Sequence, residues 1–186
     1  MKTHVLKKLS VVMLALTTSI FGACDLFDKA DDISFDSTLD ETIVVTEESS
    51  GTNVVYAKTI VLDAASDPDI NKYKNKISGF TVKKVSYQVT NFTGDASLFS
   101  GTLSFGDAST TTPTVVATIS NLNLQEAFSS GQVFDLPISQ SDVDKIAGML
   151  KDDKAVKLYL NGSLSTTPVF SNILVILEVS VKADAL

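Results

Sequence analysis

The sequence predicts an all-β protein: an antiparallel β-sandwich, immunoglobulin-like or of a related Greek-key type, with two short helices. Three observations support this prediction. Between residues 33 and 186, short runs rich in β-branched residues alternate apolar and polar side chains, which is the period of a half-buried strand. Clusters of polar turn residues separate about eight such runs at intervals of roughly 10 to 20 residues. Only two segments of this region have the period of an amphipathic helix.

Details of the sequence predict how individual strands lie in the sheets. The alternation of the run 80–89 slips by one residue at Lys83 and Lys84, which predicts a β-bulge. The run 133–138 carries Pro137, and because proline lacks an N–H for the ladder it predicts an edge strand. In chain order, the expected strands span residues 33–38, 42–46, 54–62 (after a polar turn at 47–51), 80–89, 98–105, 115–124, 133–138, 156–164 and 170–181.

The run 170–181 is the most hydrophobic stretch that follows the N-terminal segment. It predicts a central strand that is buried on both faces. We expect Ile173 and Val175 to face one layer, and Leu174 and Ile176 to face the other. If only the first face were covered, Leu174 and Ile176 would form an apolar row suited to a binding partner.

Two helices are expected, each directly before a strand. The first spans 69–78 and begins at Asp69, a residue type that caps helix N-termini. The second spans 139–151, where Ser139 and Asp142 have the spacing of a capping box. Each helix would cover an end of the sandwich.

The N-terminal segment has the layout of a secretory signal peptide. Lys7 and Lys8 lead into the 13 uncharged residues 9–21, which are followed by two small residues and by Cys24, the single cysteine of the chain. This stretch is too short to span a bilayer, which requires about 20 residues. A lone cysteine also excludes an intramolecular disulfide, so the exported part of the chain must be stable through its core.

The residues Phe21-Gly22-Ala23-Cys24 resemble the lipobox of bacterial lipoproteins, with Phe21 where that family usually has leucine. The resemblance implies that the chain is cut before Cys24 and that Cys24 is the lipid attachment site. The acyl chains would then tether the protein to a membrane. Together with the expected fold, the chain resembles exported β-sandwich lipoproteins of Gram-negative bacteria. We therefore expect it in the cell envelope, anchored to the outer membrane on its periplasmic or surface face.

These boundaries divide the chain into three parts. Residues 1–23 are the cleaved signal peptide, residues 24–32 an acidic flexible tether, and residues 33–186 the β-sandwich domain. The acidic tether resembles segments that direct some Gram-negative lipoproteins to the outer cell surface. Alternatively, its charges only keep a linker soluble.

The composition excludes several kinds of chemistry. The signal holds three of the 15 basic residues and none of the 22 acidic ones, so the net charge of the exported part is about −10, which repels nucleic acid. The chain contains no Arg and no Trp, and its one histidine, His4, is lost with the signal. Without imidazole or a free thiol, the exported part cannot form Ser-His-Asp or Cys-His nucleophile systems or His/Cys zinc sites. We expect no enzyme activity and no cofactor.

Two candidate ligand sites remain. Asp63, Asp67 and Asp69 could supply oxygen ligands to Ca²⁺, but their spacing lacks the glycine and the glutamate of an EF-hand loop. A turn in which Asp67 or Asp69 caps the following helix is the simpler interpretation. Four tyrosines could form a sugar-stacking surface if several shared one face: Tyr56, Tyr73, Tyr87 and Tyr159.

The sequence therefore predicts a lipid-anchored, non-catalytic binding or assembly module of the cell envelope, with an envelope protein or a glycan as its partner. The alternative is a carbohydrate- or calcium-dependent adhesin module, which requires aromatic side chains or loop carboxylates to converge on one end of the sandwich. A third function, a glycosidase, requires two acidic groups roughly 5 to 10 Å apart across a cleft.

Overall fold

The computed structural model describes residues 32–107, 109 and 113–184. Residues Ser34–Ala183 form one compact unit, to which the following description applies. The expected signal peptide, Cys24 and the tether up to residue 31 lie outside the described residues. No helix in the described part of the chain is both long and apolar enough to cross a membrane.

The unit is built almost entirely from antiparallel strands, so the predicted all-β antiparallel sandwich is confirmed. Buried and less buried residues alternate along most of the last strand, residues 155–184. In chain order the elements are β1 (Asp32–Asp63), the 3-10 helix η1 (Ala64–Ser66), α3 (Pro68–Tyr73), β2 (Ile77–Gly94), β3 (Leu98–Gly106), β4 (Thr114–Asn123), α4 (Leu124–Ser130), β5 (Val133–Asp135), α5 (Gln140–Asp153) and β6 (Ala155–Asp184).

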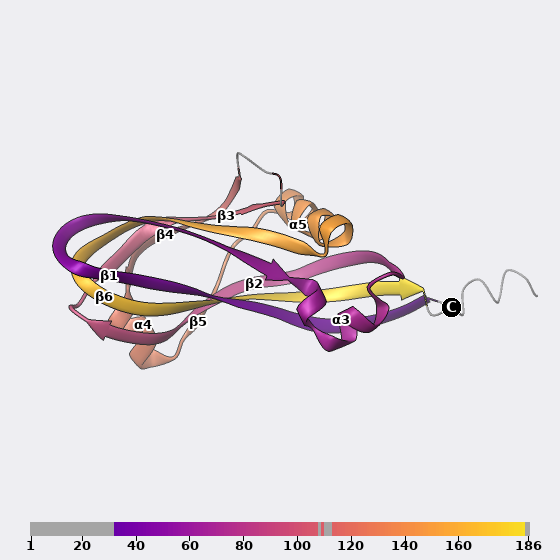
Figure 1. Ribbon diagram of the computed structural model, residues 1–186, viewed down its shortest axis with the longest axis horizontal. Coiled ribbons are helices and arrows are strands. Elements are labelled where there is room, and N and C mark those ends of the chain that lie inside the picture. The colour runs from indigo at the N-terminus through magenta and orange to yellow at the C-terminus, as the bar shows by residue number, and fades with distance from the viewer. Residues whose placement is uncertain (1–31, 108, 110–112, 185–186) are drawn as a thin grey trace, which may run out of the picture. The chain divides into compact units, whose positions relative to one another are not determined.

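Strand β6 belongs to both layers of the sandwich. It is 30 residues long and bends back on itself (Figure 1). Its first half pairs with β3, where Leu160 lies opposite Leu103. Its second half pairs with β2, where Val175 lies opposite Tyr87. Since β3 continues to β4 and β2 continues to β5, one layer contains β4, β3 and β6, and the other contains β6, β2 and β5.

Strand β1, 32 residues long, follows β6 around the same bend (Figure 1). Two hydrogen bonds mark the pairing: Thr167 Oγ1 donates to the carbonyl of Ser49 (2.6 Å), and the N–H of Ala64 donates to the carbonyl of Lys154 (2.8 Å). The partners advance along β1 and recede along β6, as an antiparallel pair requires. Each layer thereby gains half of β1 as a further strand.

The connectivity is that of a jelly roll, a double Greek key, rather than an immunoglobulin-like sandwich. The three strands expected at residues 33–38, 42–46 and 54–62 are parts of the single bent strand β1. The turn expected at 47–51 lies at its bend, where Tyr56 Oη donates to the carbonyl of Val44 at 2.7 Å. The strand continues through the turn because β6 bends with it and keeps pairing.

Two facing glycines bring β3 and β6 close together. Gly101 lies opposite Gly162, and a Cβ atom on either residue would overlap the backbone of the facing strand. It would also lie 2.8 Å from the ring of Phe99, which is fully buried. The Phe99 ring therefore occupies the space that the two absent side chains leave in the core, a pairing of aromatic and glycine also used in designed sheets.

The C-terminal run lies between β1 and β2, so its predicted central position is confirmed. Ile173 and Val175 are each 1% exposed, whereas Leu174 and Ile176 are half-buried. The prediction of burial on both faces is thus right for the inner face. It is wrong for the outer face, whose side chains are half-buried and not fully buried. Leu174 and Ile176 do not form the freely exposed apolar row considered above.

The two predicted helices form, with changed lengths. α5 begins at the predicted cap, where the N–H of Asp142 donates to Ser139 Oγ at 3.2 Å. α3 is capped by Asp67 and ends at Tyr73, before the predicted end at residue 78. It ends early because Ile77 instead pairs with Ala183 as the first residue of β2.

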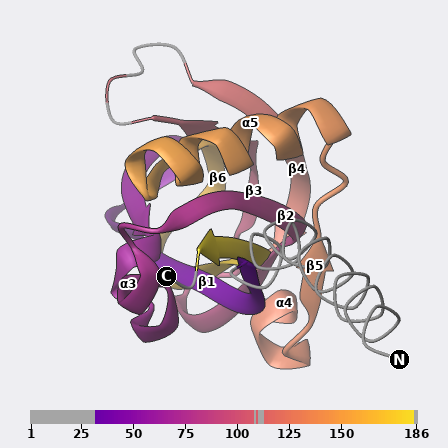
Figure 2. The ribbon, with the colours of Figure 1, turned by 90° about the vertical axis from the view of Figure 1, so that its right-hand side faces the viewer.

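Helix α4 was not expected from the sequence. It begins at Leu124, the last residue of the strand predicted over 115–124, and lies on the opposite side of the strands from α5 (Figure 1, Figure 2). The local signals are present, because Asn123 caps its start through the N–H of Glu126 and Gly131 ends it with a φ of 63°. The helix has only seven residues, too few for a hydrophobic period to be evident.

We expect Gly162→Ala to lower the free energy of unfolding by about 1–3 kcal/mol, the usual cost of overpacking a core. The physical reason is the overlap of the new methyl group with the backbone of β3 and with Phe99. Urea denaturation of the purified protein measures the change.

The matched control is Gly148→Ala in α5, where a Cβ atom would meet nothing within 4 Å. Alanine should stabilise this helix by about 0.5–1 kcal/mol relative to glycine. If Gly162→Ala left the free energy of unfolding unchanged, the two glycines would not be needed for the close approach of β3 and β6.

Candidate functional site

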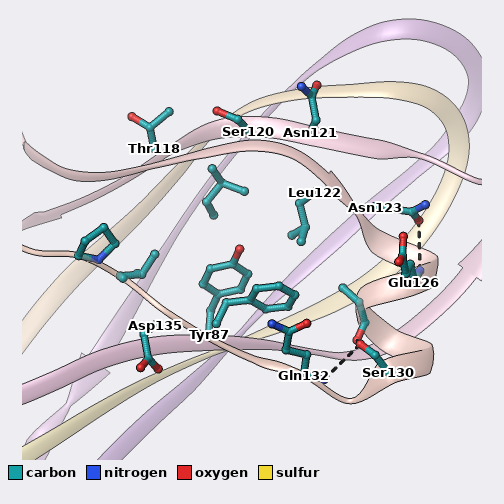
Figure 3. A pocket seen from close by; sticks show the side chains of 15 residues that line it. Tyr87, Thr118, Ser120, Asn121, Leu122, Asn123, Glu126, Ser130, Gln132 and Asp135 are labelled. Carbon is teal, nitrogen blue, oxygen red and sulfur yellow. Dashed lines mark hydrogen bonds between the residues drawn. The ribbon is translucent and has the colours of Figure 1, made fainter.

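A cleft of about 480 Å³ opens between β4, α4 and the segment that contains β5 (Figure 3). Among the described residues, β4 pairs only with β3 and β5 only with β2, so both are edge strands. The cleft therefore lies where the two layers of the sandwich leave one side open. Its volume is in the range of about 300–1,000 Å³ that is typical of small-molecule sites.

The floor of the cleft is apolar and aromatic. Tyr87 of β2 and Phe134 of β5 are register partners, and their rings stack with centroids 5.0 Å apart. Ile119, Leu122 and Leu136 complete the floor. Tyr87 is only 7% exposed, and burial raises the pKa of its hydroxyl above the usual value. This hydroxyl points into the cleft (Figure 3) and makes no hydrogen bond to any described residue.

The rim of the cleft is polar and carries no cationic side chain. Its two carboxylates, Glu126 and Asp135, are both exposed, and Asp135 accepts from Lys84 Nζ at 2.8 Å. The hydrogen bond that Lys84 donates to Asp135 is the main cause that raises the pKa of Lys84. The rim side chains are Thr118, Ser120, Asn121, Asn123, Glu126, Ser130, Gln132 and Asp135.

Local backbone features place these side chains. The β3–β4 register shifts between Phe99 and Gly101, so that Ser120 and Asn121 of β4 form a bulge opposite Ser100. Asn121 has a φ of 51°, and its N–H donates to Ser100 Oγ at 2.9 Å. A bulge bends a strand and interrupts its ladder. The chain then forms α4, reverses at its end and returns as β5 on the other side of the cleft.

The four tyrosines considered from the sequence do not share one face. Tyr87 alone lines the cleft. Tyr73 packs against Phe35 with ring centroids 5.7 Å apart, and Tyr159 lies on the half of β6 that pairs with β3. Burial raises the pKa of Tyr56, at the bend of β1, to about 12. These three rings therefore have positions in the packing of other parts of the fold.

Sequence analysis did not single out Phe134, the ring partner of Tyr87. The two residues meet only because β5 pairs with β2, and β5 is three residues long. The available signal was an aromatic residue inside the edge strand that Pro137 predicts. The structure confirms that edge position.

Asp67 acts as the cap of α3. Its Oδ1 accepts from the N–H groups of Asp69 (2.8 Å) and Ile70 (2.9 Å), and its Oδ2 accepts from Ser37 Oγ (2.7 Å). Burial acts to raise the pKa of Asp67, but these three hydrogen bonds outweigh it and lower the pKa below its usual value. Both oxygens of the carboxylate are thereby occupied.

Asp63 does not lie with the other two aspartates. It caps η1 by accepting from the N–H of Ala65 at 2.8 Å, whereas Asp67 and Asp69 line a shallow hollow beside Glu178. Among the described residues, no three His, Cys, Asp or Glu side chains are placed to hold a metal ion. The structure thus assigns Asp63 and Asp67 to capping.

No family model matches the chain, and no curated protein matches its sequence. Among solved structures, the chain is similar to the decameric BFDV capsid protein with a TM-score of 0.40 and 10% identity, over 81% of this chain and 98% of that one. It is similar to Desmodium yellow mottle tymovirus with a TM-score of 0.36 and 11% identity, over 83% of this chain and 89% of that one. It is similar to turnip yellow mosaic virus at 100 K with a TM-score of 0.33 and 11% identity, over 83% of this chain and 96% of that one. These TM-scores are too low to support any conclusion about this chain.

We expect Asp67→Ala to lower the free energy of unfolding at pH 7 by about 1–2 kcal/mol, the cost of losing a helix cap. Because the pKa of Asp67 is lower in the folded state than in the unfolded state, its carboxylate stabilises the fold fully when the pH is above the unfolded-state pKa. This stabilisation is lost as the pH falls through the folded-state pKa. Urea denaturation at pH 7 and at pH 3 should therefore show a smaller acid-induced loss in Asp67→Ala than in the wild type.

Asp63→Ala is the control, because it removes one hydrogen bond from a 3-10 helix of three residues. Its effect should be smaller than that of Asp67→Ala. EDTA should leave the wild-type melting temperature unchanged. A drop of several degrees in EDTA would contradict the capping assignment, since a metal bound only by the folded state stabilises it.

Proposed function

We propose that this protein is a lipid-anchored, non-catalytic binding module of the cell envelope, and that the cleft between β4, α4 and β5 holds its ligand. The observation that carries the proposal is the cleft itself: an aromatic floor at the open side of a rigid sandwich, surrounded by polar side chains. Pockets that combine an apolar floor with a few polar groups are the usual form of a ligand site.

The anchor is proposed from the N-terminal sequence. A basic start, an uncharged stretch and small residues lead to Cys24, the one cysteine of the chain. After cleavage before Cys24, the lipid would keep the sandwich at the outer membrane, on its periplasmic or surface face. The acidic residues between Cys24 and β1 would let the domain move away from the membrane surface.

A binding role is favoured over hydrolysis by the carboxylates of the cleft. Glycosidases need one carboxyl group that stays protonated near neutral pH, which requires burial or a close negative neighbour. Glu126 and Asp135 are both exposed, and Asp135 is paired with Lys84. The lining residues also include no His, Cys or Lys that could activate a rim hydroxyl.

We expect Cys24→Ser to abolish incorporation of labelled palmitate, because the thiol is the attachment point. The variant should accumulate as an uncleaved or soluble precursor, detected by detergent partition and by mass. Phe21→Leu is the matched control, since it restores the usual lipobox residue and should keep full labelling. Palmitate incorporation into Cys24→Ser at the wild-type level would show that the anchor is wrongly assigned.

The cleft is tested by blocking it. We expect a size-fractionated envelope extract to shift the backbone amide resonances of Ser120, Glu126 and Gln132 in ¹⁵N-labelled protein. Thr118 is exposed on β4 and lines the cleft, so Thr118→Trp should suppress these shifts at least about fivefold.

Val115→Trp is the matched control, because Val115 is 55% exposed on the same strand but does not line the cleft. It should leave the shifts unchanged. Shifts located elsewhere on the sandwich, or unaffected by Thr118→Trp, would rule out the cleft as the binding site.

A further inference from the structure

We infer that the ligand of the cleft is a neutral carbohydrate, whose ring lies against the aromatic floor while its hydroxyl groups bond the amide side chains of the rim. This inference rests on the proposed function and deepens it by naming the class of ligand. Charge, hydrogen-bonding capacity and strand geometry lead to it independently.

Charge excludes anionic ligands. No Lys side chain lines the cleft, and the chain contains no Arg. The amino group of Lys84, outside the lining, is held by Asp135. A phosphate or carboxylate ligand would find no cation and would face Glu126.

A cationic ligand is not favoured either. Since both carboxylates are at the exposed rim and none is on the floor, they provide only a weak, solvent-screened attraction for a cation. An uncharged ligand fits best.

The unused hydrogen-bonding groups match hydroxyl groups. Three side-chain groups of the cleft form no hydrogen bond with any described residue: the hydroxyl of Tyr87, the amide of Gln132 and the carboxylate of Glu126. Asn123 uses its Oδ1 atom within the protein, where it accepts from the N–H of Glu126, and this leaves its NH₂ group available. The side chain of Asn121 points away from the floor (Figure 3). The cleft therefore offers donors and acceptors in a mixed set. A sugar hydroxyl both donates and accepts, so a polyhydroxylated ligand can satisfy such a set.

The floor suits the apolar face of a pyranose. Tyr87 and Phe134 are fixed by stacking on each other and by the β2–β5 pairing, so little side-chain entropy is lost on binding. Their surroundings, Ile119 and Leu122, are apolar as well. A ligand with one face of C–H groups and a periphery of hydroxyl groups is complementary to both the floor and the rim.

A peptide in extended conformation is disfavoured by the two strand edges. Adding a strand requires a continuous row of N–H and C=O groups. On β4 the bulge at Ser120 and Asn121 interrupts that row beside the cleft. On the other side, β5 ends at Asp135, and Pro137 has no N–H to offer. Recognition in this cleft therefore depends on side chains.

The test is titration of the full-length protein in detergent with neutral trisaccharides of glucose, mannose, galactose and xylose, followed by calorimetry and by side-chain amide resonances. Trigalacturonate and an alternating Thr-Val octapeptide serve as anionic and peptide probes. We expect at least one neutral trisaccharide to bind. Gln132→Ala should weaken that binding about tenfold and Tyr87→Phe about threefold or more.

Two control variants separate the cleft from general effects. Gln125→Ala changes an exposed glutamine of α4 that does not line the cleft, and Tyr159→Phe removes a tyrosine hydroxyl on the other layer. Both should retain wild-type affinity within about twofold. Because Gln132 is exposed, the Gln132→Ala variant should fold normally. It therefore keeps the test valid even if Tyr87→Phe changes the fold.

The inference is overturned if no neutral trisaccharide binds, or if binding survives Gln132→Ala unchanged. If trigalacturonate or the octapeptide shifts the cleft resonances instead, the carbohydrate inference fails while the cleft remains the binding site. If neither these probes nor the envelope extract perturbs the cleft, the proposed function fails with it.

Discussion

The fold depends on the continuous pairing of β1 with β6. Because both strands bend together, each contributes one half to each layer, and the two layers share their longest strands. The bend also fixes the end of β2: Gly94 has a φ of 107°, and a Cβ atom there would collide with the backbone of Pro168. A side chain at this position would force β2 away from the bend of β6. The other strands are then placed by pairing outward from β6.

The same arrangement explains where the cleft lies. Long shared strands close one side of the sandwich, so the opposite side is bounded by the edge strands β4 and β5. Unprotected edges invite pairing with other chains, and proteins interrupt them with bulges, proline or very short strands. Here β4 is bulged, β5 has three residues, and Pro137 follows it. The features that protect the edges also leave a cleft whose chemistry depends on side chains.

The chemistry of the chain is consistent with a site that binds. Catalysis at neutral pH usually needs a group whose pKa has been moved toward 7, and burial or charge must do this. The carboxylates of the cleft are exposed at its rim, while Asp67, which accepts three hydrogen bonds, caps a short helix away from the cleft. The cleft instead combines two stacked aromatic rings with polar side chains, among them the amide of Gln132, which makes no hydrogen bond to any described residue. Such a set suits the binding role that we propose for the cleft.

Local sequence determined the fold class, the bulge at Lys83 and Lys84, the edge strand at Pro137 and the cap of α5, because each depends on residues that are neighbours in the chain. Only the tertiary structure decided that β1 continues through its turn and that Ile77 joins β2 rather than α3, since both follow from pairing with the distant strand β6. The site shows the same division. The local sequence predicts that an aspartate caps this helix, although only the structure decided between Asp67 and Asp69. Tyr87 and Phe134 form a cleft floor only because two strands far apart in the chain pair.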